Sequence, residues 1–270
     1  MNNKIYDCIT FFDESLQADL RFNILNSCVE QFVICESKFD HKGNYKGVNF
    51  NIENYKEFKS KIIHLVIDEK FPNTSNPWKT QAFQREFIFN GLKEARPEDY
   101  IMFSDPDEIP RPEVLLSLKL NKKFGIFLQK MFCYKLNIHN PHESPWEGTR
   151  ICLKKNLKSI DFLRQKILKK NTYYPFWRID KEKNIQLFDN GGWHFNYLSE
   201  PEKISKKLKT FAHTEYNKDE FTNIDVIKEN IHEKKDLFKR GHKYYKVQLD
   251  NTFPNYILDN QSKFNQWIEK

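Results

Sequence analysis

Paired cysteines and glycine-rich loops are the first features that this sequence lacks. Only 8 of its 270 residues are glycine, and none forms the glycine-rich loop that cradles phosphates in P-loop proteins. The five cysteines are widely spaced and contain no Cys-x-x-Cys pair, which argues against a zinc ribbon and against a disulfide framework. We expect buried free thiols in a reducing compartment: Cys8, Cys28, Cys35, Cys133 and Cys152.

Long hydrophobic runs are also missing. No segment approaches the roughly twenty consecutive apolar residues that a membrane-spanning helix requires. The first residues lack the basic flank and apolar stretch of a signal peptide and are typical of a first strand. Neither Gly-x-Ser-x-Gly nor a Cys/His dyad at a recognisable spacing occurs, which argues against those chemistries. Together these absences predict a cytoplasmic protein without a transmembrane segment.

The charge of the chain is positive but dispersed. Lys and Arg number 44 and Asp and Glu 37, which gives a formal net charge of +7. Lysine is only mildly concentrated, in residues 154–170 and 203–209, and such a distribution usually forms a solvated surface. A phosphate-rich partner, such as a nucleotide-sugar or an anionic glycolipid, and peripheral membrane contact through the Lys-rich surface are the open alternatives. No nucleic-acid-binding motif occurs, so we expect no nucleic acid partner.

Strand-like and helix-like segments alternate in the first half of the chain. Strands rich in β-branched and apolar residues are predicted at 5–12, 31–36, 61–67 and 99–104. Helices are predicted at about 13–25 and 78–95. Strands that alternate with helices imply a largely parallel sheet whose ligands bind at the carboxyl ends of the strands.

The second half is less regular. We expect one long strand or a hairpin at 124–137, a strand at 149–155, and helices at 159–168, 201–213 and 223–240. Two glycines after an asparagine predict a break in regular secondary structure at 190–192. The expected fold class is therefore α/β, with a central, mostly parallel sheet, flanking helices and a helical C-terminal extension. A single domain over residues 1–270 is the simplest arrangement, because 39% hydrophobic residues suffice for one large core.

Three carboxylates within four residues form the clearest local signal. Asp105, Asp107 and Glu108 directly follow a predicted strand, and Pro106 and Pro110 stiffen their turn. Like charges this close repel one another unless they are solvated or neutralised by a cation. Mn²⁺ or Mg²⁺ binds carboxylate oxygens and keeps coordination positions open for phosphate oxygens. The turn therefore predicts a divalent metal site; the alternative is an acidic turn that caps a helix at 112–120.

A histidine could complete this metal site. His194 follows two glycines, which permit a close approach of the backbone, and Asp189 lies just upstream. A packed, hydrogen-bonded role is the alternative for His194. His213 competes for the role of ligand, although Phe211 on the same helix favours a structural part for it.

Other polar and aromatic residues could bind substrate. Gln84 and Arg85 lie with Trp78 on the helix before the predicted metal site. Arg85 could pair with phosphates or could form a surface salt bridge instead. Trp146 lies in a loop with Pro and Gly neighbours, where it could stack on a sugar ring.

Taken together, these blocks resemble glycosyltransferase family 17, the family of the β-1,4-mannosyl-glycoprotein 4-β-N-acetylglucosaminyltransferases. The similarity extends from residue 5 to the tail. The blocks are YDCITFFDE with Leu20-Arg21, FVICES with Phe39, Trp78 with FQR, SDPDEIPRP, WEGT and GGWHFNYLSEPEKISKKLKTFAHTEY. The Gly-Gly-Pro-Glu pattern of the family appears here as Ser199-Glu200-Pro201-Glu202. The last block is the longest and the most specific.

The resemblance implies a fold and a reaction. The fold would be of the GT-A type, with a Rossmann-like sheet. A nucleotide-binding half would cover about 1–110, an acceptor and metal half about 111–215, and a tail about 216–270. The reaction would be a metal-dependent, inverting transfer of N-acetylglucosamine from UDP-GlcNAc, with Mn²⁺ or Mg²⁺ as cofactor. The acceptor would be a glycan hydroxyl of a cell-surface polysaccharide or lipopolysaccharide.

The resemblance makes Asp105 and Asp107 the metal-binding pair, and the remaining roles are our hypotheses from the residues around them. Asp105, Asp107 and His194 would hold the metal, and Glu202, with Asp189 second, would remove the proton of the acceptor hydroxyl. The donor site would contain Phe11, Asp13, Glu14, Arg21, Glu36, Gln84, Arg85 and Asp105. The acceptor site would contain Trp146, Glu147 and Trp193. Capping or ion pairing is the alternative role for Asp13, Glu14, Arg21 and Glu36.

Two other functions stay open. Metal-dependent phosphoryl transfer or hydrolysis also uses clustered aspartates, but it would need a second acidic cluster or a nucleophilic Asp at a strand end, which the sequence does not show. A carbohydrate-binding module without catalytic activity would leave the aspartate pair of the turn without a role.

Overall fold

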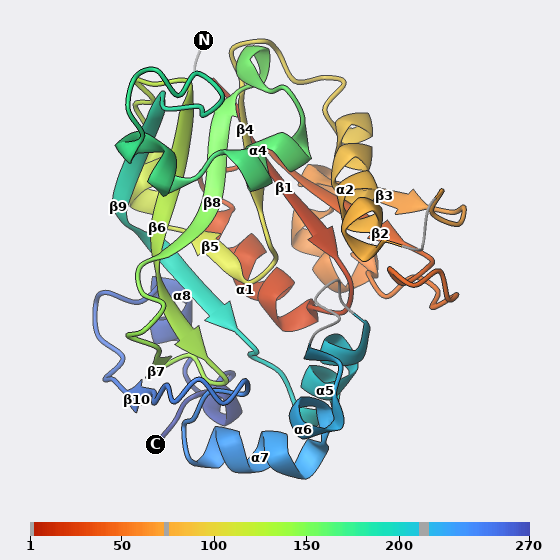
Figure 1. Ribbon diagram of the computed structural model, residues 1–270, viewed down its shortest axis with the longest axis vertical. Coiled ribbons are helices and arrows are strands. Elements are labelled where there is room, and N and C mark those ends of the chain that lie inside the picture. The colour runs from red at the N-terminus through yellow and green to blue at the C-terminus, as the bar shows by residue number, and fades with distance from the viewer. Residues whose placement is uncertain (1–2, 73–75, 211–215) are drawn as a thin grey trace.

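Parallel strands form the first half of the central sheet in the computed structural model, which describes residues 3–72, 76–210 and 216–270 (Figure 1). These strands are β1 (Ile5–Phe11), β2 (Gln31–Ser37), β3 (Ile62–Ile67) and β4 (Tyr100–Ser104). β1 pairs in parallel with β2 and β4, and β2 pairs in parallel with β3. The four predicted strands of the first half are therefore confirmed, close to their expected bounds.

Helices connect these parallel strands. They are α1 (Ser15–Leu25), η1 (Ile52–Lys61), α2 (Pro77–Phe87) and η2 (Ile88–Gly91). Asn76 caps α2 by accepting hydrogen bonds from the backbone of Trp78 and Lys79, and Pro77 occupies the first helical turn. The predicted helix at 78–95 is thus shorter, since it tightens into the 3₁₀ segment η2 and ends before Leu92.

Antiparallel pairs enter the sheet in the second half. Its elements are β5 (Glu108–Pro110), α3 (Pro112–Leu116), β6 (Phe124–Cys133), β7 (Ile138–His139), β8 (Trp146–Leu153), η3 (Lys154–Asn156), α4 (Ile160–Lys166), η4 (Lys169–Tyr173) and β9 (Ile185–Asn196). β8 lies antiparallel between β4 and β6, whereas β9 runs parallel to β6 and antiparallel to β5. The parallel order predicted from the sequence therefore describes the first half, and the second half is mixed.

The two consecutive glycines lie inside a strand. The predicted break at 190–192 is wrong, because β9 continues through this segment with a shift in register against β6. Gly192 has a φ of +142°, and a Cβ atom there would lie 2.2 Å from the carbonyl oxygen of Ile109. Gly192 therefore allows β5 to pack directly against β9.

The C-terminal part is less helical than the sequence predicts. Its elements are α5 (Pro201–Thr210), α6 (Asp219–Thr222), α7 (Ile224–His232), β10 (Tyr245–Lys246), α8 (Asn255–Asp259) and η6 (Asn265–Trp267). The predicted helix at 223–240 ends at His232, since Lys234 adopts a left-handed backbone with a φ of 55°. β10 pairs with β7 at the edge of the sheet, whose order is β10-β7-β6-β8-β4-β1-β2-β3.

Helical segments cover both faces of the parallel strands. Alternate residues of β1 point to opposite sides: Ile9 and Phe11 pack in one apolar cluster, and Tyr6 and Cys8 in another. The first cluster contains residues of α1, η1 and α8, and the second contains residues of η2 and α4. The predicted α/β class with flanking helices is confirmed.

The predicted burial of the free thiols holds for four cysteines, whereas Cys28 is only partly buried. All five cysteines are free thiols, and four of them are buried: Cys8, Cys35, Cys133 and Cys152. Within the described ranges, no helix is both long enough and apolar enough to cross a bilayer.

Candidate active site

The acidic turn leaves the carboxyl end of β4 and leads directly into β5. Asp105 closes it by accepting a hydrogen bond at 3.0 Å on its carbonyl oxygen from the backbone of Glu108, whose carboxylate accepts one at 3.2 Å from the backbone of Asp105. The alternative of a helix cap is wrong, because α3 has Arg111 at its N-cap position and no side-chain capping bond. The carboxylates of the turn therefore do not cap α3.

Arg21 holds the turn from inside the protein. This arginine is fully buried on α1, and its Nε and Nη2 donate to the carboxylate of Asp7 at 2.6 and 2.5 Å. Its remaining donors reach the hydroxyl of Ser104 at 2.9 Å and the carbonyl of Glu108 at 2.7 Å. The sequence interpretation of Arg21 as a donor-binding residue is corrected here, since all of these partners lie in the core.

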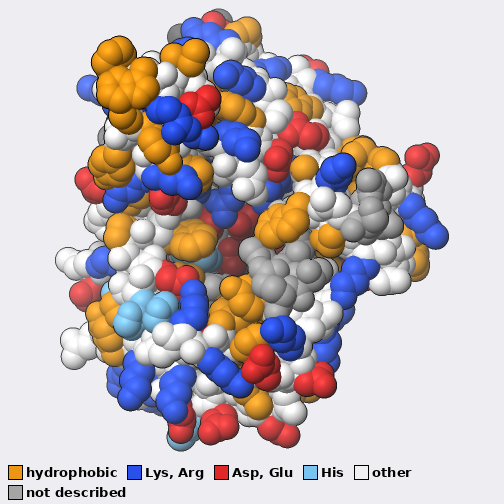
Figure 2. Space-filling view, in the orientation of Figure 1, with side chains coloured by type: hydrophobic (Ala, Val, Ile, Leu, Met, Phe, Trp, Pro, Cys, Tyr) orange, Lys and Arg blue, Asp and Glu red, His pale blue; other side chains and the backbone are white. Residues whose placement is uncertain are grey.

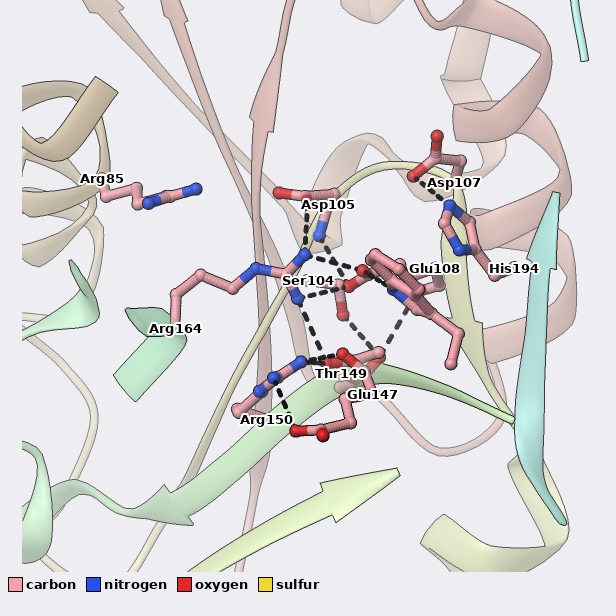
Figure 3. Close-up of polar contacts among 12 residues, drawn as sticks. Arg85, Ser104, Asp105, Asp107, Glu108, Glu147, Thr149, Arg150, Arg164 and His194 are labelled. Atoms are coloured by element: carbon pink, nitrogen blue, oxygen red, sulfur yellow. Dashed lines mark hydrogen bonds and ion pairs between the residues drawn. The ribbon is translucent and has the colours of Figure 1, made fainter. Parts of the chain in front are cut away.

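Arg164 holds the same turn from the other side. Its guanidinium, on α4, binds Asp105 at 2.5 Å and both carboxylate oxygens of Glu108 at 2.8 and 3.0 Å (Figure 3). Glu108 is fully buried and also accepts the indole hydrogen of Trp146 at 2.7 Å. Burial lowers the pKa of Arg164, but the charges of Asp105 and Glu108 outweigh it and raise the pKa above its ordinary value.

Asp107 faces a different pair of side chains, the imidazole of His194 and the ammonium group of Lys207. His194 Nε2 lies 3.5 Å from one of its carboxylate oxygens and Lys207 Nζ lies 3.6 Å from the other. His194 reaches this position because β9 aligns it with Glu108 across the β5–β9 pair. Burial raises the pKa of Asp107, whereas Lys207 and His194 lower it, and the net result is a pKa far below the ordinary value. Asp107 is therefore ionised at neutral pH.

Asp105 is ionised as well. Burial raises its pKa, but the guanidinium groups of Arg164 and Arg85 lower it below the ordinary value. In Figure 3, Arg85 points toward Asp105 without contacting it. The repulsion inferred from the sequence is thus relieved in part by cations that the chain itself supplies.

A cavity of about 880 Å³ opens over this turn. Figure 2 shows acidic side chains at the bottom of a hollow near the centre of the visible face. The cavity brings together nine of the residues predicted from the sequence: Phe11, Glu14, Gln84, Arg85, Asp105, Asp107, Trp146, Glu147 and His194. Its volume is that of a small-molecule binding site.

Polar contacts fix the wall formed by α2. Gln84 donates to the carbonyl of Cys35 at 3.0 Å and contacts His41 Nε2 at 3.0 Å. Arg85 pairs with Asp161 at 2.8 Å, while its Nε is buried with no hydrogen-bond partner in the described part of the chain. Arg85 therefore forms the ion pair named as its alternative and still has a donor to offer to a ligand.

Six predicted residues do not line this cavity. Glu202 is 58% exposed and pairs with Lys228 at 3.7 Å, and Asp189 is exposed on β9. Trp193 is buried, with its indole hydrogen on the carbonyl of Thr252 at 3.1 Å and its ring under Arg111. The roles of catalytic base and acceptor contact are corrected for these three residues, because none of them lines the main cavity and Glu202 and Trp193 have their partners elsewhere.

Two more predicted carboxylates, Glu36 and Asp13, lie outside the main cavity, and one predicted histidine cannot be judged. Glu36 is fully buried and accepts hydrogen bonds from Lys46 and from the backbone of Asn49 and Phe50, so it organises that loop instead of contacting the cavity. Asp13 pairs with Lys203 at 3.3 Å outside the main cavity. His213 lies outside the described residues. Arg21, discussed above, completes the set of six.

Sequence reasoning missed two cations of the site. Lys207 lies three residues after the buried Ile204 on α5, and Arg164 follows the buried Leu163 on α4. Each is therefore next to the inward face of its helix, which is the signal that could have found it.

The donor atoms of the turn suit a divalent cation in part. Among the residues that the structure describes, no three His, Cys, Asp or Glu side chains are grouped to hold a metal ion. The contacts of Asp107 with His194 and Lys207 exceed hydrogen-bond length, and His194 Nδ1 is buried without a described partner. Two ionised carboxylates offer oxygens that Mn²⁺ or Mg²⁺ prefers, provided that a phosphate-bearing ligand supplies the rest of the coordination shell.

The chain is similar in sequence to a known protein family over nearly its whole length. The sequence pattern of glycosyltransferase family 17 matches residues 1–265. The chain is 24% identical over 230 residues to the rat β-1,4-mannosyl-glycoprotein 4-β-N-acetylglucosaminyltransferase, which covers 76% of this chain and 42% of the rat protein. The human protein of the same name is 25% identical over 215 residues, or 70% of this chain and 40% of its own length. The matched region is thus less than half of either relative.

Similarity to solved structures is more distant. The crystal structure of HddC from Yersinia pseudotuberculosis aligns with a TM-score of 0.38 and 10% sequence identity, over 70% of this chain and 90% of that chain.

Proposed function

Because this chain belongs to glycosyltransferase family 17, we propose that it transfers a sugar from a nucleotide-sugar onto a glycan hydroxyl. The proposed donor is UDP-GlcNAc and the proposed fold type is GT-A. The observation that carries the proposal is the Asp105-Pro106-Asp107 turn at the carboxyl end of β4, which opens into the main cavity. In α/β sheets, ligands bind at this end of the strands.

The cations of the cavity suit the diphosphate of such a donor. Arg85, Arg164 and Lys207 all line the cavity that contains the turn. A departing nucleoside diphosphate gains negative charge as the bond to the sugar breaks, and fixed positive groups lower the energy of that state. Arg85 can approach a phosphate through its unpartnered Nε, whereas Arg164 would have to share its hydrogen bonds with Asp105 and Glu108.

We further propose that Asp105 and Asp107 hold Mn²⁺ or Mg²⁺ together with the donor. When bound, the ion would neutralise charge on the diphosphate as it leaves. His194 and Lys207 would keep the carboxylate of Asp107 ionised and oriented. The guanidinium of Arg164, and the hydrogen bond that the backbone N–H of Asp105 donates to the carboxylate of Glu108, would keep Asp105 at the cavity floor.

Glu147 is the best-placed proton acceptor for the sugar hydroxyl. The cavity is lined by five carboxylates besides those of the turn: Glu14, Asp40, Glu143, Glu147 and Asp236. In the described part of the chain, only Glu14 and Glu147 have an oxygen that accepts no hydrogen bond. In Glu14 that oxygen faces Lys207 at 3.9 Å, whereas Glu147 pairs with Arg150 at 3.6 Å through its hydrogen-bonded Oε2, which leaves Oε1 open to the cavity ligand. Glu147 is adjacent to Trp146, whose ring lines the cavity and can stack on an acceptor sugar.

A donor screen tests the proposed reaction. The protein is incubated with Mn²⁺ and several UDP-sugars, and release of UDP is measured. We expect one sugar, UDP-GlcNAc, to be hydrolysed or transferred preferentially, and we expect excess chelator to stop the reaction until metal is restored. Free phosphate in place of UDP would favour phosphoryl transfer, and thermal stabilisation by UDP and Mn²⁺ without turnover would favour a binding module. Full activity in chelator would contradict the metal role.

A further inference from the structure

A short segment outside the catalytic cavity exposes four large apolar side chains. We call residues 173–179 the aromatic segment. The exposed fractions of its apolar residues are 73% for Tyr173, 84% for Phe176, 65% for Trp177 and 93% for Ile179. Figure 2 shows hydrophobic side chains gathered at the upper left of the molecule, with Lys and Arg beside them. Contiguous apolar exposure of this kind marks an interaction site.

The aromatic segment is held in an ordered turn. Lys183 Nζ donates to the carbonyls of Phe176 at 3.1 Å and Arg178 at 2.8 Å. Arg178 makes two hydrogen bonds to Asp180, at 2.7 and 2.8 Å. The rings of Phe176 and Trp177 meet edge to face, with centroids 5.2 Å apart. Because polar contacts bind the backbone and the basic side chains to one another, the apolar side chains remain pointing outward.

Positive charge surrounds these apolar side chains. Residues 166–183 contain six Lys or Arg and two Asp or Glu. A second cavity, of about 560 Å³, adjoins the segment and includes Ile179 in its lining. Its charged lining consists of four lysines and two acidic residues, Asp180 and Glu182, and is therefore net positive; the lysines are Lys158, Lys166, Lys170 and Lys181. The first three form no ion pair within the described ranges, so their charges are available to a ligand.

The second cavity adjoins the main one. Gln165, Leu168 and Lys170 line both of them. Helix α4 therefore has Arg164 directed to the acidic turn and its next two residues, Gln165 and Lys166, in the lysine-lined cavity.

From these observations we propose that the aromatic segment and the lysine-lined cavity dock the protein onto a membrane surface rich in anionic lipids. Trp, Tyr and Phe side chains favour the interface between headgroups and acyl chains, and an inserted Ile adds apolar contact. Lysines near the surface are attracted by the negative potential of anionic headgroups, and the cavity can receive their phosphate groups. The outcome is a reversible, peripheral attachment.

A second copy of the chain is a poorer occupant of this surface. A two-fold symmetric contact would place each aromatic segment against its equivalent and would bring the two sets of lysines together. This like-charge contact opposes dimerisation, whereas an anionic bilayer neutralises the same charges. If the proposed glycosyl transfer holds, the docked orientation also suits an acceptor carried on a lipid, because the two cavities share part of their lining.

Vesicle flotation tests this docking. The protein is mixed with neutral phosphatidylcholine vesicles or with vesicles that contain about 30% phosphatidylglycerol, and neither kind carries an acceptor. We expect binding to the anionic vesicles only, and a loss of binding of at least about tenfold in the double variant Phe176→Ser/Trp177→Ser. Reversal of two cavity charges, Lys166→Glu/Lys170→Glu, should abolish binding as well.

Matched controls separate this surface from general stickiness. Tyr45→Ser removes a similarly exposed aromatic ring, and Lys56→Glu/Lys93→Glu reverses two exposed lysines elsewhere, so both variants should bind vesicles like the wild type. Lipids brominated in their acyl chains should quench the fluorescence of Trp177, and Trp177→Phe should keep vesicle binding but lose that quenching.

The proposal is overturned if the serine variant binds as well as the wild type, if the wild type does not bind anionic vesicles, or if light scattering shows that the segment mediates a dimer. UDP release measured without lipid should be unchanged in the serine variant, so a failure of docking is distinguishable from a failure of the proposed reaction.

Discussion

Two arginines bind the acidic turn, Arg21 from the protein interior and Arg164 from the side of the main cavity. On the inner side Arg21 binds Asp7, Ser104 and the backbone of Glu108, all of them buried. On the cavity side Arg164 binds the carboxylates of Asp105 and Glu108, and the side chain of Asp105 is 36% exposed. The two guanidinium groups therefore have different roles. Arg21 fixes the path of the backbone, and Arg164 lines the main cavity, where a ligand can bind.

This difference in exposure determines which contacts of the turn a substrate can change. A ligand cannot reach the partners of Arg21, so substitution there alters stability first. The partners of Arg164 include a carboxylate that a metal or a phosphate can approach, so substitution there alters the site first. Separating the two effects by variants is the direct way to test the comparison.

The largest effect is expected on the cavity side, at Asp107. Asp107→Asn removes the charge that faces His194 and Lys207 while keeping the size of the side chain. We expect sugar transfer to fall by about a thousandfold, since an electrostatic contact to the reacting groups is lost. Steady-state UDP release measures the loss. Because the ionised carboxylate of Asp107 also stabilises the fold through Lys207 and His194, thermal unfolding should show a lowered midpoint, but a smaller loss of stability than in Arg21→Met. A collapse of stability instead would show that Asp107 belongs to the inner, structural side.

On the inner side, the largest effect is expected from Arg21. Arg21→Met leaves the carboxylate of Asp7 buried without its partner and should lower the free energy of unfolding by about 3–5 kcal/mol. Urea unfolding followed by circular dichroism measures the change. Arg21→Lys, which keeps the charge, should lose less, and the double variant Asp7→Asn/Arg21→Met should recover part of the stability. A stable Arg21→Met protein with impaired transfer would overturn the comparison.

Arg164 should show the opposite balance. Arg164→Lys keeps a positive charge but loses the forked geometry that binds Asp105 and Glu108 together. We expect transfer to fall by about 10- to 100-fold, because Asp105 and the diphosphate are no longer held in a fixed arrangement. The free energy of unfolding should fall less than in Arg21→Met. Equal losses of stability in the two variants would mean that both sides of the turn are structural.

The smallest effect is expected outside the cavity. Glu202→Gln alters an exposed side chain that pairs only with Lys228 in the described structure, so transfer should change by less than about twofold. Its matched variant is Glu147→Gln, which removes the proposed proton acceptor and should lower the turnover rate by about a hundredfold or more. The comparison uses kcat at saturating donor and acceptor. A large loss in Glu202→Gln with an active Glu147→Gln would restore the base predicted from the sequence.

Local patterns in the sequence were sufficient for the parallel half of the fold. Each of its strands is a short apolar run bounded by turn signals, and such runs alternate with helices in chain order. The acidic turn could be located for the same reason, because its position at a strand end is readable from neighbouring residues. The mixed half could not be derived in this way, since the pairing of β9 with both β5 and β6 joins segments distant in sequence.

The partners of the turn were harder to predict than the turn. Glu202 and Lys207 lie on the same helix, five residues apart, and therefore on different faces of it. The sequence pattern identified the carboxylate near the helix start, but packing turned the face with Lys207 toward Asp107. Arg21 and Glu36 show the same limit: a charged residue near a strand end can serve the core or a ligand, and only its distant partners decide between these roles.

The contacts of Arg21 also have a consequence for how the acidic turn forms during folding. Its contacts join α1, β1, the end of β4 and the start of β5, and β5 in turn pairs with β9. Because these segments shape the turn only together, we expect the site to form as part of the cooperative folding of the domain. The backbone amide of Phe195, which donates to the carbonyl of Asp107 at 2.8 Å, should consequently exchange its hydrogen for deuterium only when the whole domain opens.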